Sequence, residues 1–74
     1  MMVTARRVEE LDNKVRYQFG FDEDFDRVLI IDKNTLQASV EDGNFNSAAS
    51  AISAKIVRAF QSNGEFPPGA IFAS

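Results

Sequence analysis

The chain contains no cysteine and no histidine among its 74 residues. The absence of cysteine excludes disulfides and thiolate metal sites, and it fits a reducing compartment. The absence of histidine removes the commonest metal ligand and the commonest general base. Carboxylates, hydroxyls, lysines and Tyr17 are left without a thiol or imidazole to activate them, so we expect a protein that is not an enzyme and has no catalytic residues.

Long apolar runs and clustered glycines are also absent. The longest strongly apolar run is VLII, residues 28–31, whereas a membrane-spanning helix needs roughly 20 such residues. The N-terminal segment lacks the apolar stretch of a signal peptide. The four glycines, at positions 20, 43, 64 and 69, are too scattered for a phosphate-binding loop. We expect a soluble, cytoplasmic protein with no membrane contact, no cofactor and no evident small-molecule ligand.

A chain of this length forms one small domain. Such a domain buries only about 60% of the surface that its unfolded chain exposes, so it often gains stability from a metal, very good packing or a partner subunit. The apolar share of 45% suits a globular core. The net charge of −3 is concentrated in residues 22–26, which hold four acids and no base. The acidity of the chain is therefore local.

The clearest element is a helix over residues 47–62. Apolar side chains recur every four positions at Ile52, Ile56 and Phe60, with Ala49 and Val57 beside them. Asn46 or Ser47 can cap the start of this helix, and Gly64 can end it in the left-handed region.

Three segments upstream of the helix predict strands. KVRYQFGF (14–21) alternates apolar and polar residues, and RVLIID (27–32) is a short run rich in β-branched residues. LQASV (36–40) alternates again, and it is joined to the second run by the turn sequence DKNT. EDGN (41–44) then predicts the loop into the helix.

The N-terminal segment allows two interpretations. It could be a first strand paired with 14–21 through a turn at Asp12 and Asn13, which we prefer, or a helical turn with Ala5, Val8 and Leu11 on one side. The preferred fold is an α+β domain over residues 1–64, with an antiparallel sheet of three to four strands in β-β-β-β-α order. One amphipathic helix packs on one face, and residues 65–74 form an extended Pro-Gly tail.

The predicted core lies between that helix and one face of the sheet. It comprises Tyr17, Phe19, Phe21, Leu29, Ile31, Leu36 and Val40 from the sheet, with Ile52, Ile56 and Phe60 from the helix. Val28 and Ile30 would then point to the opposite face, which a single helix leaves without cover. We expect the tail or another chain to provide that second layer.

The C-terminal tail is unusually apolar for a chain terminus, because termini are commonly polar and frayed. Its candidate contact residues are Phe66, Pro67, Pro68, Ile71 and Phe72. They could cover an edge of the protein's own sheet as a short extra strand. Alternatively, they could bind a second copy or another protein, by strand addition or by filling a groove.

The stretch FGFDEDFD, residues 19–26, suggests two sites that its details do not support. Its alternating acids resemble the start of a calcium loop, but Arg27 stands where the loop needs Gly and Lys33 where it needs Glu. Phe19, Gly20 and Phe21 match the middle of an RNA-binding strand pattern, but the neighbouring acids repel phosphates. We interpret the acids as a solvated connection and expect no nucleic-acid partner.

The leading hypothesis is therefore a non-catalytic protein-interaction domain that self-associates as a homodimer or binds a protein partner through residues 66–72. The small residues of the helix offer a second possible dimer contact, although packing on the domain's own sheet explains them as well. They are Ala48, Ala49, Ala51, Ala54 and Ala59, with Ser50 and Ser53. The alternative function is an acidic domain that responds to divalent cations through Asp22, Glu23, Asp24 and Asp26. No metal ligand set is predicted.

Overall fold

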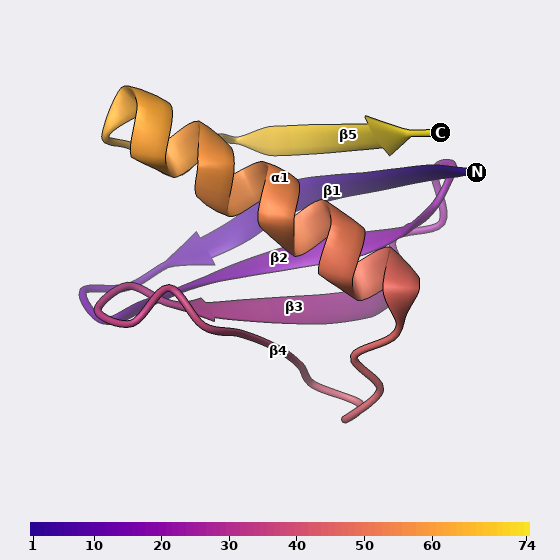
Figure 1. The fold of residues 1–74 in the computed structure, drawn as a ribbon. Coiled ribbons are helices and arrows are strands. Elements are labelled where there is room, and N and C mark those ends of the chain that lie inside the picture. The colour runs from indigo at the N-terminus through magenta and orange to yellow at the C-terminus, as the bar shows by residue number, and fades with distance from the viewer.

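Five strands and one helix follow one another in the computed structural model, which describes residues 1–74. The elements are β1 (Met2–Glu10), β2 (Lys14–Phe21), β3 (Arg27–Asp32), β4 (Ala38–Val40), α1 (Ser47–Asn63) and β5 (Gly69–Ala73). All strands join one antiparallel sheet in the order β4-β3-β2-β1-β5. The helix crosses one face of this sheet diagonally, and both chain ends lie together at one end of it (Figure 1).

The α+β class and the single helix on one face are confirmed, but the sheet has five strands where three to four were predicted. The additional strand is β5, which follows the helix and pairs with the outer side of β1. The order is therefore β-β-β-β-α-β. Three of its five residues, Gly69 and two alanines, have low β-propensity, so its pairing relies on the tertiary contacts described below.

The N-terminal segment is a strand, as preferred, because its alternation fits the sheet. Val3 and Ala5 point toward the helix and are buried, and they pair with Phe21 and Phe19 of β2. The register shifts between Arg7 and Glu9, which is the signature of a β-bulge. The helical alternative for this segment is wrong.

The helix begins and ends at the capping residues that the sequence indicates. The Asn46 side chain accepts a hydrogen bond of 3.1 Å from the Ala49 backbone N–H. Gly64 has a φ angle of 80° and donates its backbone N–H to the Phe60 carbonyl at 2.7 Å. Only a glycine adopts this left-handed conformation without strain. The helix is not long and apolar enough to cross a membrane.

The core lies between α1 and one sheet face, and most of the predicted core residues are buried there. The buried apolar residues are Val3, Ala5, Val15, Tyr17, Phe19, Leu29, Ile31, Val40, Ala48, Ala49, Ile52, Ile56 and Phe66. The prediction was wrong for Phe21, which is 51% exposed at the end of β2. Leu36 and Phe60 are only partly buried against this core. Leu36 has a φ angle of 61° in the turn before β4, which therefore starts only at Ala38.

The opposite face of the sheet carries no helix and is covered by its own long polar side chains. Val28 and Ile30 lie on this face beside Gln18 and Arg16, and both are only partly exposed. Arg16 forms ion pairs with Glu9 at 3.2 Å and with Glu41 at 3.3 Å. The aliphatic stems of such side chains shield apolar neighbours while their charges stay in water. This face therefore has cover without a second layer.

The acidic connection 22–26 folds back onto the same open face. Gly20 faces this connection so closely that a Cβ atom there would lie 1.6 Å from the Asp24 carbonyl oxygen. The Thr4 hydroxyl donates to the Asp22 carbonyl, and the Arg6 guanidinium lies 4.3 Å from the centre of the Phe25 ring. The FGFDEDFD stretch is thus a strand end followed by a tightly folded connection, and Gly20 is the residue that permits it.

Replacing Gly20 by Ala tests this close approach. We expect Gly20→Ala to lower the free energy of unfolding by about 1–3 kcal/mol, the usual cost of overpacking, measured by urea denaturation. Gly69→Ala is the matched control. Its added methyl group would also approach a backbone carbonyl oxygen, that of Ala5, but at 3.0 Å, which requires a much smaller shift. A loss for Gly20→Ala no larger than that of the control would contradict the folded-back connection.

Candidate functional site

The candidate site is the C-terminal segment, which runs beside β1 at one edge of the sheet (Figure 1). The five predicted contact residues fall into two groups. Phe66, Pro67 and Pro68 lie before β5 and attach it to the domain. Ile71 and Phe72 lie within β5 and point to opposite faces of the sheet.

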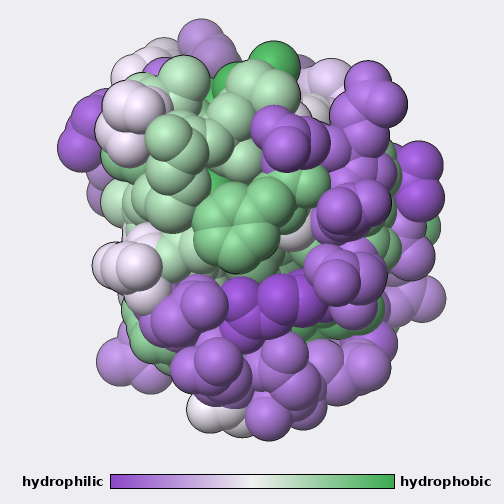
Figure 2. Space-filling model, turned by 90° about the vertical axis from the view of Figure 1, so that its right-hand side faces the viewer, coloured by the Kyte–Doolittle hydropathy of each residue, from purple (hydrophilic) through white to green (hydrophobic).

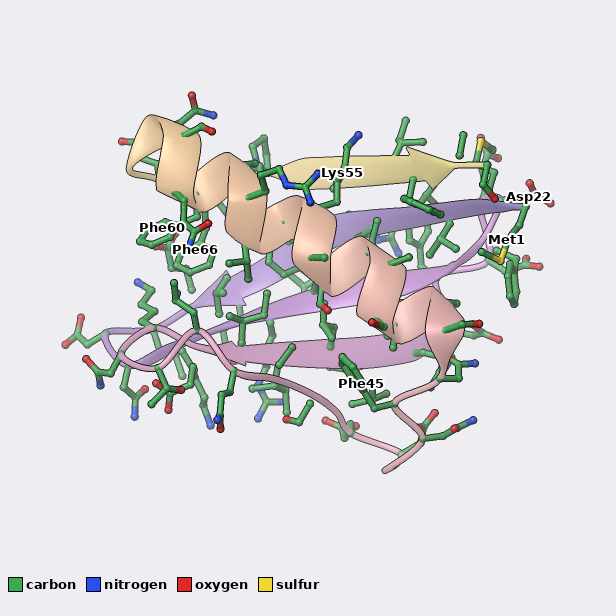
Figure 3. The ribbon with its side chains drawn as sticks, viewed as in Figure 1. Met1, Asp22, Phe45, Lys55, Phe60 and Phe66 are labelled. Atoms are coloured by element: carbon green, nitrogen blue, oxygen red, sulfur yellow. The ribbon has the colours of Figure 1, made fainter.

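Phe66 is part of the domain's own core. Its side chain is 4% exposed, and its ring stacks on the Phe60 ring with 4.2 Å between centroids and 15° between planes. The two rings lie side by side below the C-terminal end of α1 (Figure 3). The structure therefore uses Phe66 to fix the tail beneath the helix.

Three successive carbonyl groups of the tail accept hydrogen bonds from β1 and β2. The Phe66 carbonyl accepts from Arg7 Nη1 at 2.9 Å, and the Pro67 carbonyl accepts from the Tyr17 hydroxyl at 2.6 Å. The Pro68 carbonyl accepts from the Arg7 backbone N–H at 2.8 Å. The two prolines have no N–H of their own, so their backbone presents acceptors only. These three bonds, which we call the carbonyl clamp, set the direction in which the chain enters β5.

Tyr17 donates to the carbonyl clamp from a buried position. Burial raises the pKa of its hydroxyl to about 12, because the phenolate would lose its hydration. The nearby positive charge of Arg7 opposes this rise in pKa, and the negative charge of Glu10 adds to it. The hydroxyl therefore remains protonated and able to donate throughout the neutral range.

The backbone of β5 bonds to β1 with alternate residues only. The Pro68 carbonyl and the Ser74 N–H both bond to β1, and the register pairs Ala70 with Ala5 and Phe72 with Val3. In an antiparallel ladder, bonding residues alternate with residues whose N–H and C=O point the other way. The backbone groups of Gly69, Ile71 and Ala73 therefore point away from β1. No strand lies on that side of β5.

The residues of β5 themselves carry none of the usual protection against pairing with other chains. Exposed edges are commonly blocked by charged side chains, prolines, bulges or very short strands. Residues 66–74 contain no charged side chain, and the Ile71 side chain is 58% exposed. The opposite edge, β4, has only three residues and is followed directly by Glu41 and Asp42. Only one edge of the sheet is thus open to another strand.

Two grooves flank β5, one on each face of the sheet. The open-face groove has a volume of about 520 Å³ and is lined by Thr4, Ala5, Glu23, Phe25, Gly69, Ala70 and Ile71. The helix-side groove has a volume of about 330 Å³ and is lined by Ser50, Ala51, Ala54, Lys55, Arg58 and Phe72. Lys55 projects from α1 on the side of β5 (Figure 3). A strand added to β5 would lie between these grooves.

An apolar patch occupies the end of the molecule where the two termini meet. Figure 2 looks at this end and shows apolar residues gathered on it, with hydrophilic residues on one side and below. Among the exposed apolar residues, Met1, Met2 and Phe21 lie here, since Met2 pairs with Ala73 and Val3 pairs with Phe21. The patch therefore continues from the outer edge of β5 onto the sheet end.

The acids of the 22–26 connection do not converge. Asp22, Glu23, Asp24 and Asp26 are all exposed, and no group of three carboxylates comes together anywhere in the chain in a way that could hold a metal ion. Their arrangement follows from the fold-back over Gly20. The geometry gives no support to the cation-responsive alternative.

Sequence reasoning missed the role of Arg27. Its guanidinium bonds to both carboxylate oxygens of Asp42, at 3.0 and 3.3 Å, and to the Asn46 side chain at 3.0 Å. It also lies 4.8 Å from the centre of the Phe19 ring. The hydrogen bond from Arg27, followed by that from the Asn44 N–H, lowers the pKa of Asp42. Arg27 thereby joins the start of the helix to the sheet, and no local sequence signal distinguishes it from a solvated arginine.

Comparison with known proteins gives no relative: no family model, no curated protein and no solved structure matches the chain.

The variant Tyr17→Phe tests the carbonyl clamp. It removes the bond to the Pro67 carbonyl, and we expect a loss of about 1 kcal/mol in the free energy of unfolding near neutral pH. In the wild type, the raised pKa makes the free energy of unfolding depend on pH. The stability that the Tyr17 hydroxyl contributes is complete below pH 10 and falls as the pH rises from 10 toward about 12. Tyr17→Phe should lack that alkaline fall.

Tyr17 is the only tyrosine and the chain has no tryptophan, so an absorbance titration of the folded protein reports this hydroxyl alone. A midpoint near 12 is expected. A midpoint near the ordinary tyrosine value of 10 would contradict a buried hydroxyl bonded to Pro67.

Proposed function

We propose that this chain is a non-catalytic protein-interaction domain that self-associates through the outer edge of β5. The observation that carries the proposal is that β5 is an uncharged edge strand with no strand on its outer side, and that its central residue, Ile71, is 58% exposed. Strand addition at such an edge gains main-chain hydrogen bonds and buries the adjacent side chains.

A second copy is the occupant that these features favour. A two-fold dimer places the same surface of each copy against the other, so a charge in the contact strand close to the two-fold axis would meet a like charge. Residues 66–74 have no charged side chain, so the strand itself brings no like charges together. Association would also add a buried interface to a domain whose single core is small.

The amino-acid composition supports the rest of the proposal, namely a cytoplasmic protein without catalysis, cofactor, metal or nucleic acid. The lack of histidine and cysteine supports a role without catalysis, cofactor or metal, and the local acidity supports a role without nucleic acid. The lack of cysteine also agrees with action in the cytoplasm. Protein contacts are what the exposed apolar surface around β5 is suited to make.

Sedimentation equilibrium of the wild type and of Ile71→Lys tests this proposal. The wild type should show a monomer–dimer equilibrium, and Ile71→Lys should weaken it at least about tenfold, because two like charges would meet at the strand edge. The melting temperature of the dilute monomer should change little, since the Ile71 side chain is mostly exposed.

Val8→Lys is the matched control, because Val8 is a 50% exposed apolar residue of β1 that lies outside the β1–β5 pairing. This variant should associate like the wild type. A wild type that stays monomeric up to millimolar concentration, or an Ile71→Lys variant that still dimerises normally, would refute the proposal.

A further inference from the structure

The outer edge of β5 is self-complementary in one register. We propose that two copies pair their β5 strands antiparallel about a two-fold axis at Ile71, forming one continuous sheet across both domains. This inference rests on the self-association proposed above and specifies which atoms make the contact.

The spacing of the outward backbone groups selects this register. The backbone groups that point away from β1 belong to Gly69, Ile71 and Ala73. A two-fold axis at Ile71 places each Gly69 opposite the Ala73 of the second copy. Ile71 then pairs with itself. Each such pair exchanges two N–H to C=O hydrogen bonds, so all outward donors and acceptors within the strand are satisfied.

Neighbouring registers leave backbone groups without partners. An axis at Ala70 sets Ala73 opposite Pro67, which has no N–H to donate and whose carbonyl already accepts from Tyr17. An axis at Phe72 moves Gly69 past the end of β5. An axis between two residues sets the outward backbone groups of one copy opposite residues of the other copy whose N–H and C=O already bond to β1. The register centred on Ile71 therefore makes the most hydrogen bonds.

The side chains on the open face allow this pairing. Ile71 would contact the Ile71 of the second copy, while Gly69, which has no side chain, would lie beside the second copy's Ala73. The open-face groove includes Gly69 and Phe25 in its lining. Met2 pairs with Ala73 and is 39% exposed, so the second copy's Met2 would approach this groove and become buried. Both copies would contribute one such contact by symmetry.

On the helix side, the pairing brings the two helix-side grooves toward each other. The small residues Ser50, Ala51 and Ala54 let the second copy approach closely, but Lys55 and Arg58 line the same groove. Each copy would therefore present positive charges to the other. Because salt screens such repulsion, the association should strengthen when the ionic strength is raised.

Single-cysteine variants test the register, and the chain has no native cysteine to interfere. Bonded antiparallel partners have Cα atoms about 5.5 Å apart, within the range that a disulfide spans. Ile71→Cys should therefore form disulfide-linked dimers under mild oxidation. Ala73→Cys alone should not, because the two Ala73 positions would lie four residues apart along the strand, at least about 13 Å. Ala73→Cys mixed with Gly69→Cys should cross-link as a mixed pair.

The outcomes separate this register from self-association itself. A protein that sediments as a dimer but links through Ala73→Cys alone, and not through Ile71→Cys, would overturn the register and leave the β5 contact standing. A dimer in which none of Ile71→Cys, Ala73→Cys and the mixed pair cross-links would overturn β5 pairing altogether. A wild type that sediments only as a monomer would refute the proposed function and this inference with it.

Discussion

The attachment of β5 to β1 is the interaction on which the rest of this structure depends. Phe66 under the helix and the carbonyl clamp on residues 66–68 hold the returning chain, and Phe72 then packs on the core. Without this attachment, β1 would be the edge of the sheet and the C-terminal end of α1 would lack its stacked aromatic ring. The same attachment determines which backbone groups remain unpaired.

The sheet leaves two surfaces without a neighbouring element, the face opposite the helix and the outer edge of β5, and only the face is covered by the domain's own side chains. The open face is covered from within, by Arg16 with its two glutamate partners and by Phe25 folded back beside Arg6. Val28 and Ile30 therefore need no second layer, although the sequence alone favoured one. The outer edge of β5 has no such cover from within. The surface that a partner could use is consequently an edge, with the grooves beside it, and not a face.

Sequence patterns predicted those elements whose signals are local. The helix follows from its apolar period and from Asn46 and Gly64, and β2 and β3 follow from alternation and β-branched residues. Phe21 and Leu36 were misplaced because burial at a strand end depends on where the helix crosses the sheet and on a left-handed turn residue.

The candidate site was only partly predictable for the same reason. An uncharged, apolar tail is visible in the sequence, and it indicated residues 66–72. Which of them anchor the tail and which face outward depends on Tyr17 and Arg7, which lie 50 and 59 residues along the chain from the carbonyl groups that they bind. Gly69 and Ala73 contribute through their backbone groups, which no side-chain pattern reveals.

Backbone amide hydrogen exchange measured by NMR at low and high protein concentration tests the central claim most directly, because it resolves β5 residue by residue. At low concentration, Ala70, Phe72 and Ser74 should be protected by their bonds to β1, while Gly69, Ile71 and Ala73 exchange quickly. At high concentration, the second set should become protected as well. Protection of Gly69, Ile71 and Ala73 that does not change with concentration would contradict an outer edge of β5 that pairs with a second copy.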